Sequence, residues 1–158
     1  MEPMREYTVE DLLEAVKAGR VDDMLAILDA GHVDVNAEVK IEDDNGEEDS
    51  RTALVYACEL GWNDTVAFLL SRDNIQVNVK CGKSGKSAVM YASENGLAEV
   101  VRMLLDHGGV DINDVDADGK SAVMFASENG HAEVAWMLLD HGGVDINLVD
   151  EEVRCSIS

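Results

Sequence analysis

The segment Gly82-Lys83-Ser84-Gly85-Lys86-Ser87 is the part of this sequence that most resembles a ligand-binding loop. Phosphate-binding loops of nucleotide hydrolases end in Gly-Lys-Ser/Thr, because backbone N–H groups and the lysine hold the phosphates. Such a loop also needs a buried strand before it and a glycine at position 80, where this chain has Lys80. The triplet recurs as Gly119-Lys120-Ser121, 34 residues later. It therefore indicates a structural repeat, with at most weak anion binding at a helix N-terminus.

The other reactive side chains form no recognised catalytic or metal-binding pattern. The three cysteines (Cys58, Cys81 and Cys155) lack paired spacing, which is typical of a reducing compartment. His107 and His141 occupy equivalent places at the ends of predicted helices, where a histidine can serve the helix C-terminus. The other two histidines have no cysteine or carboxylate at ligand spacing. We therefore expect no catalytic residue, no metal and no cofactor.

Residues 37–51 form an acidic insertion, with six acids among the eight residues 42–49. Their spacing does not fit a calcium-binding loop, because the alternation that such a loop requires does not follow Asp44. A run of this kind usually forms a solvated, mobile loop, and this is the interpretation we favour. The alternative is a finger that binds a partner.

The second half of the chain repeats itself. Residues 87–113 and 121–147 differ at only four of 27 paired positions: Tyr91/Phe125, Leu97/His131, Val101/Ala135 and Arg102/Trp136. The period of 34 residues extends upstream with less identity, and Asn36, Asn78, Asn113 and Asn147 close the four units. A fixed period of this length is typical of stacked units, none of which can bury its apolar face alone.

Each unit is predicted to contain two short helices. In the last unit Ser121 is a natural N-cap for a helix from Ala122 to about Asn129, and Gly130 ends it. A second helix is predicted from about Ala132 to Asp140. The predicted divisions are an N-terminal capping repeat at 1–36, an acidic insertion loop at 37–51, repeats at 52–78, 79–113 and 114–147, and the start of an incomplete further repeat or a C-terminal tail at 148–158.

At these residues the chain resembles the ankyrin-repeat family. The family pattern D-x-x-G-x-T-P-L-H-x-A, G-x-x-x-x-V-x-x-L-L and G-A-D-V-N is matched by Asp116, Gly119, Ser121, Ala126, Gly130, Val134, Leu138, Leu139, Gly142, Asp145 and Asn147. The Thr-Pro-Leu-His element is replaced by Thr52-Ala-Leu-Val and by two copies of Ser-Ala-Val-Met, which implies softer units. The resemblance implies an all-α solenoid of stacked helix-turn-helix units with short β-hairpin fingers, and it implies protein binding through the concave side.

The resemblance also implies which positions face a partner. Glu59, Glu94 and Glu128 make an acidic ladder, and Arg51, Lys86 and Lys120 make a basic one at the finger roots. The two ladders either pair with each other or read a partner of mixed, mostly positive charge. The concave-side residues are Arg51, Glu59, Leu60, Lys83, Ser84, Lys86, Glu94, Asn95, Ala117, Asp118, Lys120, Glu128 and Asn129.

Trp136 stands apart from these residues. It replaces Arg102 on the second helix of its unit, at a place that the resemblance puts on the convex back. A tryptophan there either covers the neighbouring turn or contacts another protein or a further unit.

Composition narrows the choice of partner and location. The chain of 158 residues carries 33 acidic and 12 basic residues, a formal net charge of −21. Such a charge repels nucleic-acid phosphate and anionic lipid, so we expect neither nucleic acid nor membrane as a partner. No apolar run follows Met1, and none approaches the ~20 residues of a membrane span. We expect a cytoplasmic protein, with the nucleus as the alternative.

The leading hypothesis is a non-catalytic protein-interaction module that binds a protein or peptide of basic character. One alternative is a domain that senses a small nucleotide-like anion; another is an engineered, consensus-like repeat protein without a native partner, although the irregular first half argues against design. Residues 148–158 begin another finger and stop where a helix would start, so we expect either a fragment of a longer array or an apolar C-terminal edge open to self-association.

Overall fold

The structure, a computed structural model, describes residues 6–144. Within them it contains α1 (Val9–Lys17), α2 (Val21–Asp29), β1 (Val39–Glu42), β2 (Glu48–Arg51), α3 (Ala53–Leu60), α4 (Asn63–Leu70), α5 (Ala88–Glu94), α6 (Ala98–His107), α7 (Ala122–Glu128) and α8 (Ala132–His141). The predicted further unit at 148–158, together with Asn147 and Cys155, lies outside the described residues.

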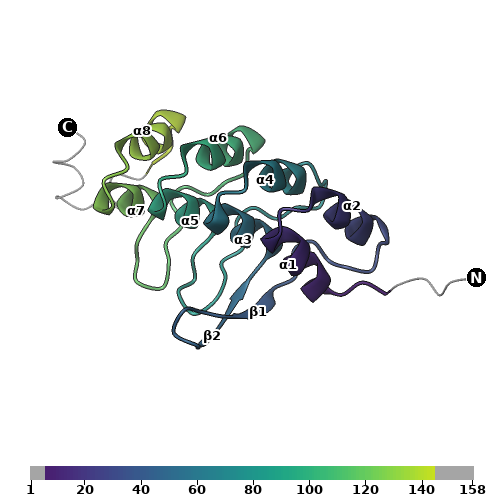
Figure 1. Cartoon of the computed structure of the whole chain (residues 1–158). Helices are drawn as coiled ribbons and strands as arrows, with labels where there is room; N and C mark the ends of the chain where they lie inside the picture. Colours follow the sequence, from purple (N-terminus) through teal and green to yellow (C-terminus); the bar gives the residue numbers. More distant parts are fainter. Residues whose placement is uncertain (1–5, 145–158) are drawn as a thin grey trace, which may run out of the picture.

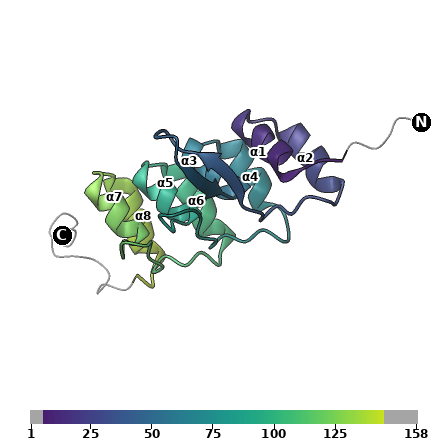
Figure 2. The same cartoon turned by 90° about the horizontal axis from the view of Figure 1, so that it is seen from below.

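The helices form two parallel rows (Figure 1). The odd-numbered helices stand side by side in one row, the even-numbered helices form the other, and the fingers project beyond the odd-numbered row. Seen from the finger side in Figure 2, α1 and α2 lie at one end of the stack and α7 and α8 at the other. The predicted solenoid of helix-turn-helix units with hairpin fingers is therefore confirmed.

Hydroxyl side chains start several of the first helices of the units. Thr8 and Asp11 form a reciprocal capping box on α1, with the Asp11 N–H 3.2 Å from Thr8 Oγ1 and the Thr8 N–H 2.9 Å from Asp11 Oδ2. Thr52 and Ser121 accept a backbone N–H at α3 and α7, which confirms the predicted cap at Ser121. Ser87 holds the same place at α5 without a capping bond, and its buried hydroxyl has no hydrogen-bond partner among the described residues.

The core runs continuously along the stack between the two rows. Small residues, Ala57 and Ala92 among them, are fully buried on the first helices and let neighbouring helices approach closely. Leu69, Leu104 and Leu138 fill the equivalent place on α4, α6 and α8 and are fully buried as well. Each unit therefore buries its apolar stripe against its neighbours, as a stack of incomplete units requires.

The closing asparagines join successive fingers. The side-chain amides of Asn36 and Asn78 each donate to a backbone carbonyl of the next finger at 2.7 Å. Each also accepts a backbone N–H two residues further along that finger at 2.8 Å. Asn113 Nδ2 donates in the same way to the carbonyl of Gly143 at 2.6 Å. The side chains thus satisfy finger backbone groups that have no regular sheet partner.

The insertion at residues 37–51 is acidic and largely exposed, as expected, but it forms two paired strands rather than the loop that the sequence favoured. It contains an antiparallel hairpin in which Val39 pairs with Arg51 and Ile41 with Asp49. Asp43 closes the turn, because its Oδ1 accepts two backbone N–H groups, at 2.9 and 2.8 Å. The loop interpretation weighed the acidic charge and missed the alternation of β-branched and charged residues along β1.

The side chain of His131 packs closely on Gly96 and leaves no room for a larger residue there. Gly96 has φ +68°, and a Cβ there would lie 2.5 Å from Nδ1 of His131, whose Nε2 is 3.0 Å from the carbonyl oxygen of Glu94. Gly130 has φ +75° and open space around it, which makes it the matched control. We expect Gly130→Ala to lower the free energy of unfolding by about 1 kcal/mol, the cost of a positive φ.

Gly96→Ala is expected to lower the free energy of unfolding by about 2 kcal/mol, because the His131 ring must also move and lose its hydrogen bond. Urea denaturation of the two variants measures the difference. Equal losses of unfolding free energy in the two variants would show that the packing of His131 on Gly96 does not contribute to stability.

Candidate functional site on the finger-side face

The candidate site is the finger-side face, formed by the odd-numbered helices and the fingers (Figure 1). In the three units that begin with α3, α5 and α7, a cation directly precedes the N-cap of the first helix, and a glutamate lies in the last turn of that helix. The two side chains meet as ion pairs: Arg51 Nε to Glu59 Oε2 at 3.0 Å, Lys86 Nζ to Glu94 Oε2 at 2.7 Å, and Lys120 Nζ to Glu128 Oε2 at 2.9 Å. The basic and acidic ladders therefore pair with each other, which was one of the two interpretations left open.

Aromatic rings join one pair to the next. The Arg51 guanidinium lies 4.8 Å from the centre of the Tyr91 ring in the following unit. Lys86 Nζ lies between two rings, 5.4 Å from Tyr91 and 4.7 Å from Phe125. Lys120 Nζ lies 5.9 Å from Phe125. Cations and rings thus alternate along the face, so most of the basic ladder is engaged within the protein.

Arg51 departs most from its predicted role. It was predicted to face a partner, but its side chain is buried, with Nη1 2.5 Å from Asp49 Oδ2 in addition to the pair with Glu59. Burial acts to lower the pKa of Arg51, but the hydrogen bonds from the guanidinium to Glu59 and Asp49 outweigh it and raise the pKa. Arg51, the last residue of β2, is therefore a structural cation that joins carboxylates of β2 and α3.

The pKa of Asp49 shifts in the opposite direction to that of Arg51. Its partial burial acts to raise its pKa, but hydrogen bonds from Arg51 and from the backbone N–H groups of Ser50 and Lys83 lower the pKa below its usual value. A lowered folded-state pKa means that Asp49 adds stability above its unfolded-state pKa, and this stability is lost as the pH falls through the folded-state value.

The hairpin also fixes the next finger. Ser50 Oγ accepts the N–H of Gly82 at 3.1 Å, and Asp49 Oδ1 accepts the N–H of Lys83 at 3.1 Å. The Lys83 ammonium pairs with Glu47 at 3.2 Å. Sequence reasoning missed Glu47, Asp49 and Ser50 as parts of this face; the Val39–Ile41 alternation could have revealed the strand, but nothing local identifies the finger that it contacts.

These contacts weaken the case for anion binding at the Gly82–Ser87 segment. The N–H groups of Gly82 and Lys83, which a phosphate would need, donate to Ser50 and Asp49 instead. Both lysines of the segment are paired with glutamates. A cavity of about 290 Å³ beside it is lined by Lys40, Glu48, Asp49, Ser50, Gly82 and Lys83, so two carboxylates face any anion that enters.

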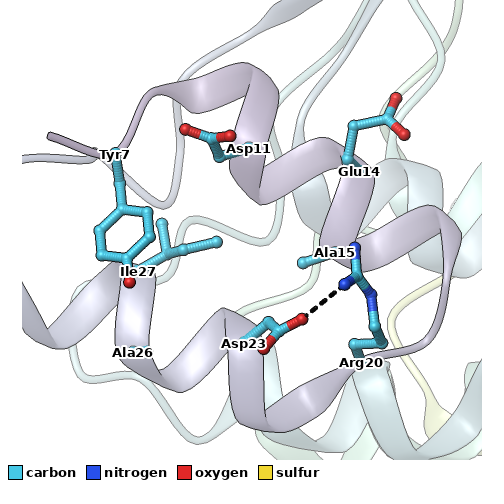
Figure 3. Close-up of a pocket in the computed structure, with 8 residues that line it drawn as sticks. All are labelled: Tyr7, Asp11, Glu14, Ala15, Arg20, Asp23, Ala26 and Ile27. Atoms are coloured by element: carbon cyan, nitrogen blue, oxygen red, sulfur yellow. Dashed lines mark ion pairs between the residues drawn. The ribbon is translucent and has the colours of Figure 1, made fainter. Parts of the chain in front are cut away.

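A second cavity, of about 300 Å³, lies between α1 and α2 (Figure 3). Its rim carries Asp11, Glu14 and Asp23, and its one cation, Arg20, points to Asp23 at 2.8 Å. This arrangement also disfavours an anion. Among residues 6–144 no cluster of three or more histidine, cysteine or carboxylate side chains is suited to a metal ion.

The remaining predicted contact residues divide between the two rows. Most are exposed on the finger-side face, at helix ends or finger tips: Leu60, Lys83, Asn95, Ala117, Asp118, Glu128 and Asn129. Ser84 is half-buried, and its carbonyl accepts the N–H of Ala117 at 2.9 Å. Trp136 is exposed on α8, in the other row. Contact of these residues with a partner stays a prediction.

No helix in the described part of the chain combines the length and the apolar character that crossing a membrane requires.

Comparison with known proteins agrees with this architecture. A comparison with curated proteins finds no match to the sequence. The family described as "Ankyrin repeats (3 copies)" matches residues 12–116 and again residues 77–150. The two matches cover the stacked helix pairs, the fingers and the asparagine bridges described above. The chain belongs to the ankyrin-repeat family.

Proposed function

We propose that this chain is a non-catalytic protein-binding module whose finger-side face takes a protein or peptide segment of basic character. Ankyrin repeats are generally protein–protein interaction modules, which supports the class of function. The basic character of the partner is inferred from the charges on the finger-side face.

The observation that carries the proposal is the unequal exposure of the paired charges. The side chains of Arg51 and Lys86 are 7% and 17% exposed, whereas those of Glu59 and Glu94 are 32% and 33% exposed. The cations of these two pairs therefore lie beneath the carboxylates, whereas Lys120 and Glu128 are equally exposed, at 39% and 38%. An approaching partner meets oxygen atoms first, so the face presents mainly negative charge.

Unpaired acids at the fingers add to this charge. Glu42 and Asp44 on the hairpin and Asp118 on a later finger are exposed, and they form no ion pair with another described residue. With a formal net charge of −21, the protein attracts cationic segments over a distance and accelerates their encounter. The stack is already formed, so a partner segment that lies along it does not have to order the face as well.

The test uses two variants that each lose three negative charges. Glu42→Gln/Asp44→Asn/Asp118→Asn changes the finger-side face, and Asp22→Asn/Asp106→Asn/Glu133→Gln changes exposed, unpaired acids on the even-numbered helices. The probe is a fluorescent deca-lysine peptide, and its affinity is measured by anisotropy at low ionic strength. We expect the first variant to bind about tenfold more weakly, which corresponds to about 1.4 kcal/mol.

The second variant is the control for total charge, and we expect its affinity to fall by no more than about twofold. Equal losses in the two variants would show that the peptide responds only to net charge and would contradict a finger-side site. Absence of deca-lysine binding to the unmodified protein would contradict the basic character of the partner.

A further inference from the structure

Two exposed apolar side chains stand together at the edge of the finger-side face. Of the four large hydrophobic residues exposed in the described part of the chain, Leu60 (43%) and Trp62 (45%) flank Gly61 in the turn between α3 and α4. Neither belongs to the buried core. Single exposed hydrophobic residues are ordinary, but two large ones in one three-residue turn call for a physical reason.

The other units use the same positions for internal contacts. At the place of Trp62, the next unit has Leu97, which packs against the core and would contact a Cβ at Gly61 at 3.2 Å. The last unit has His131, which covers Gly96 and lies within hydrogen-bond distance of the Glu94 carbonyl. In both units the residue after the turn glycine covers the turn of the preceding unit.

At the place of Leu60, the later units carry an asparagine that bonds to backbone. Asn95 Nδ2 donates to the carbonyl of Glu59 at 3.4 Å, and Asn129 Nδ2 donates to that of Phe125 at 2.8 Å. The amide therefore satisfies a carbonyl near the end of a first helix, in the preceding unit or in its own. Leucine has no polar group with which to do the same.

Trp62 does not perform the covering role of its counterparts. The preceding turn contains Gly19, and no heavy atom lies within 4 Å of the place where its Cβ would be. The indole therefore does not lie against Gly19 as Leu97 and His131 lie against Gly61 and Gly96. Its exposure, and that of Leu60, is not explained by contacts within the described residues.

We infer that Leu60 and Trp62 form an apolar anchor site for a polypeptide segment that carries one large hydrophobic side chain flanked by basic residues. This inference rests on the function proposed above and names the partner's chemistry. Tryptophan is enriched among residues that dominate binding energy, and leucine adds apolar area beside it. Glu59 directly precedes Leu60, and its side chain is 32% exposed although it is paired with the buried Arg51, so a cation next to the hydrophobic side chain meets opposite charge.

The chain supplies its own matched substitutions for a test. Leu60→Asn and Trp62→Leu introduce the residues that the next unit carries at those positions, and Trp136→Arg introduces the residue of the preceding unit. All three residues are tolerated by a sister unit, so the variants are expected to keep the fold, which circular dichroism checks. Trp136→Arg is the control for an exposed tryptophan in the other row and leaves Trp62 as the single fluorescent indole.

The probes are a lysine-rich peptide with one central phenylalanine and the same peptide with glycine in that place. We expect the Trp136→Arg protein to bind the phenylalanine peptide about tenfold more tightly than the glycine peptide, with a blue shift of Trp62 emission. In Leu60→Asn/Trp62→Leu, labelled-peptide anisotropy is expected to give equal affinities for the two peptides.

Equal affinities for both lysine peptides in the Trp136→Arg protein would overturn the anchor while leaving the acidic surface in place. A phenylalanine peptide flanked by serines that binds as tightly as the lysine version would overturn the requirement for basic residues. Loss of the phenylalanine advantage in Trp136→Arg relative to the unmodified protein would move the apolar contact to α8 and contradict the assignment to the α3–α4 turn.

Discussion

Replacing Leu104 with alanine is expected to lower the free energy of unfolding by about 3–4 kcal/mol, which is the largest effect of any single change considered for this chain. Leu104 is fully buried on α6, between α4 and α8. Truncation removes apolar area and leaves a cavity that helices packed on both sides cannot close. Urea denaturation followed by far-ultraviolet circular dichroism measures the loss.

Leu138→Ala provides the matched control. Leu138 holds the equivalent place on α8 and is as deeply buried, but among the described helices α8 packs mainly against α6 and α7. In a stack whose units contact only their neighbours, damage at an end opens that end first. We expect hydrogen exchange to accelerate only in α7 and α8 for Leu138→Ala, and throughout the stack for Leu104→Ala. Identical exchange patterns would contradict this description of the stack.

The second large effect is expected for Arg51→Ala, at about 2–3 kcal/mol of unfolding free energy. The guanidinium is buried and holds Asp49 and Glu59 together, so its removal leaves two carboxylates facing each other without a cation. The contact with the Tyr91 ring is lost as well. The estimate lies below the range for a fully buried pair because the Glu59 side chain retains one third of its exposure.

The same substitution in the next two units is the control for position. Lys86→Ala removes a cation that is 17% exposed and lies between two rings, so we expect a smaller loss. Lys120→Ala removes a cation that is 39% exposed, and the urea midpoint is expected to move little. A loss for Lys120→Ala as large as that for Arg51→Ala would show that burial by the hairpin does not set the strength of these pairs.

The repeat made most of the fold predictable. Ser121 and Gly130 gave the ends of α7 to within one residue, because capping chemistry is local. The repeat also placed Asn36 and Asn78 at equivalent positions, and both form the same bridge, since a polar residue at the same place in each unit meets the same backbone groups. Where two units are nearly identical, their neighbours are nearly identical too, and local reasoning is sufficient.

The candidate site was less predictable, because its contacts cross from one unit to another. The sequence places Arg51 and Lys86 at equivalent positions, but only the folded hairpin buries the first more deeply than the second. Asp49 looks like one acid among six until β2 brings it to the N–H of Lys83. The exposure of Trp62 likewise depends on the turn at Gly19, more than 40 residues earlier in the chain. Non-local geometry decided these three features.

The asparagine bridges constrain the sequence on only one side of each junction between two successive fingers. Asn36 and Asn78 supply the side-chain amide, whereas the receiving finger contributes only main-chain groups. Every amino acid provides these groups except proline, which lacks the N–H. Substitutions other than proline on the receiving finger therefore leave the hydrogen bonds of the bridge in place, whereas replacing the asparagine removes them. Duplication or exchange of whole units by recombination would preserve every bridge between fingers, provided that each unit carries its own asparagine.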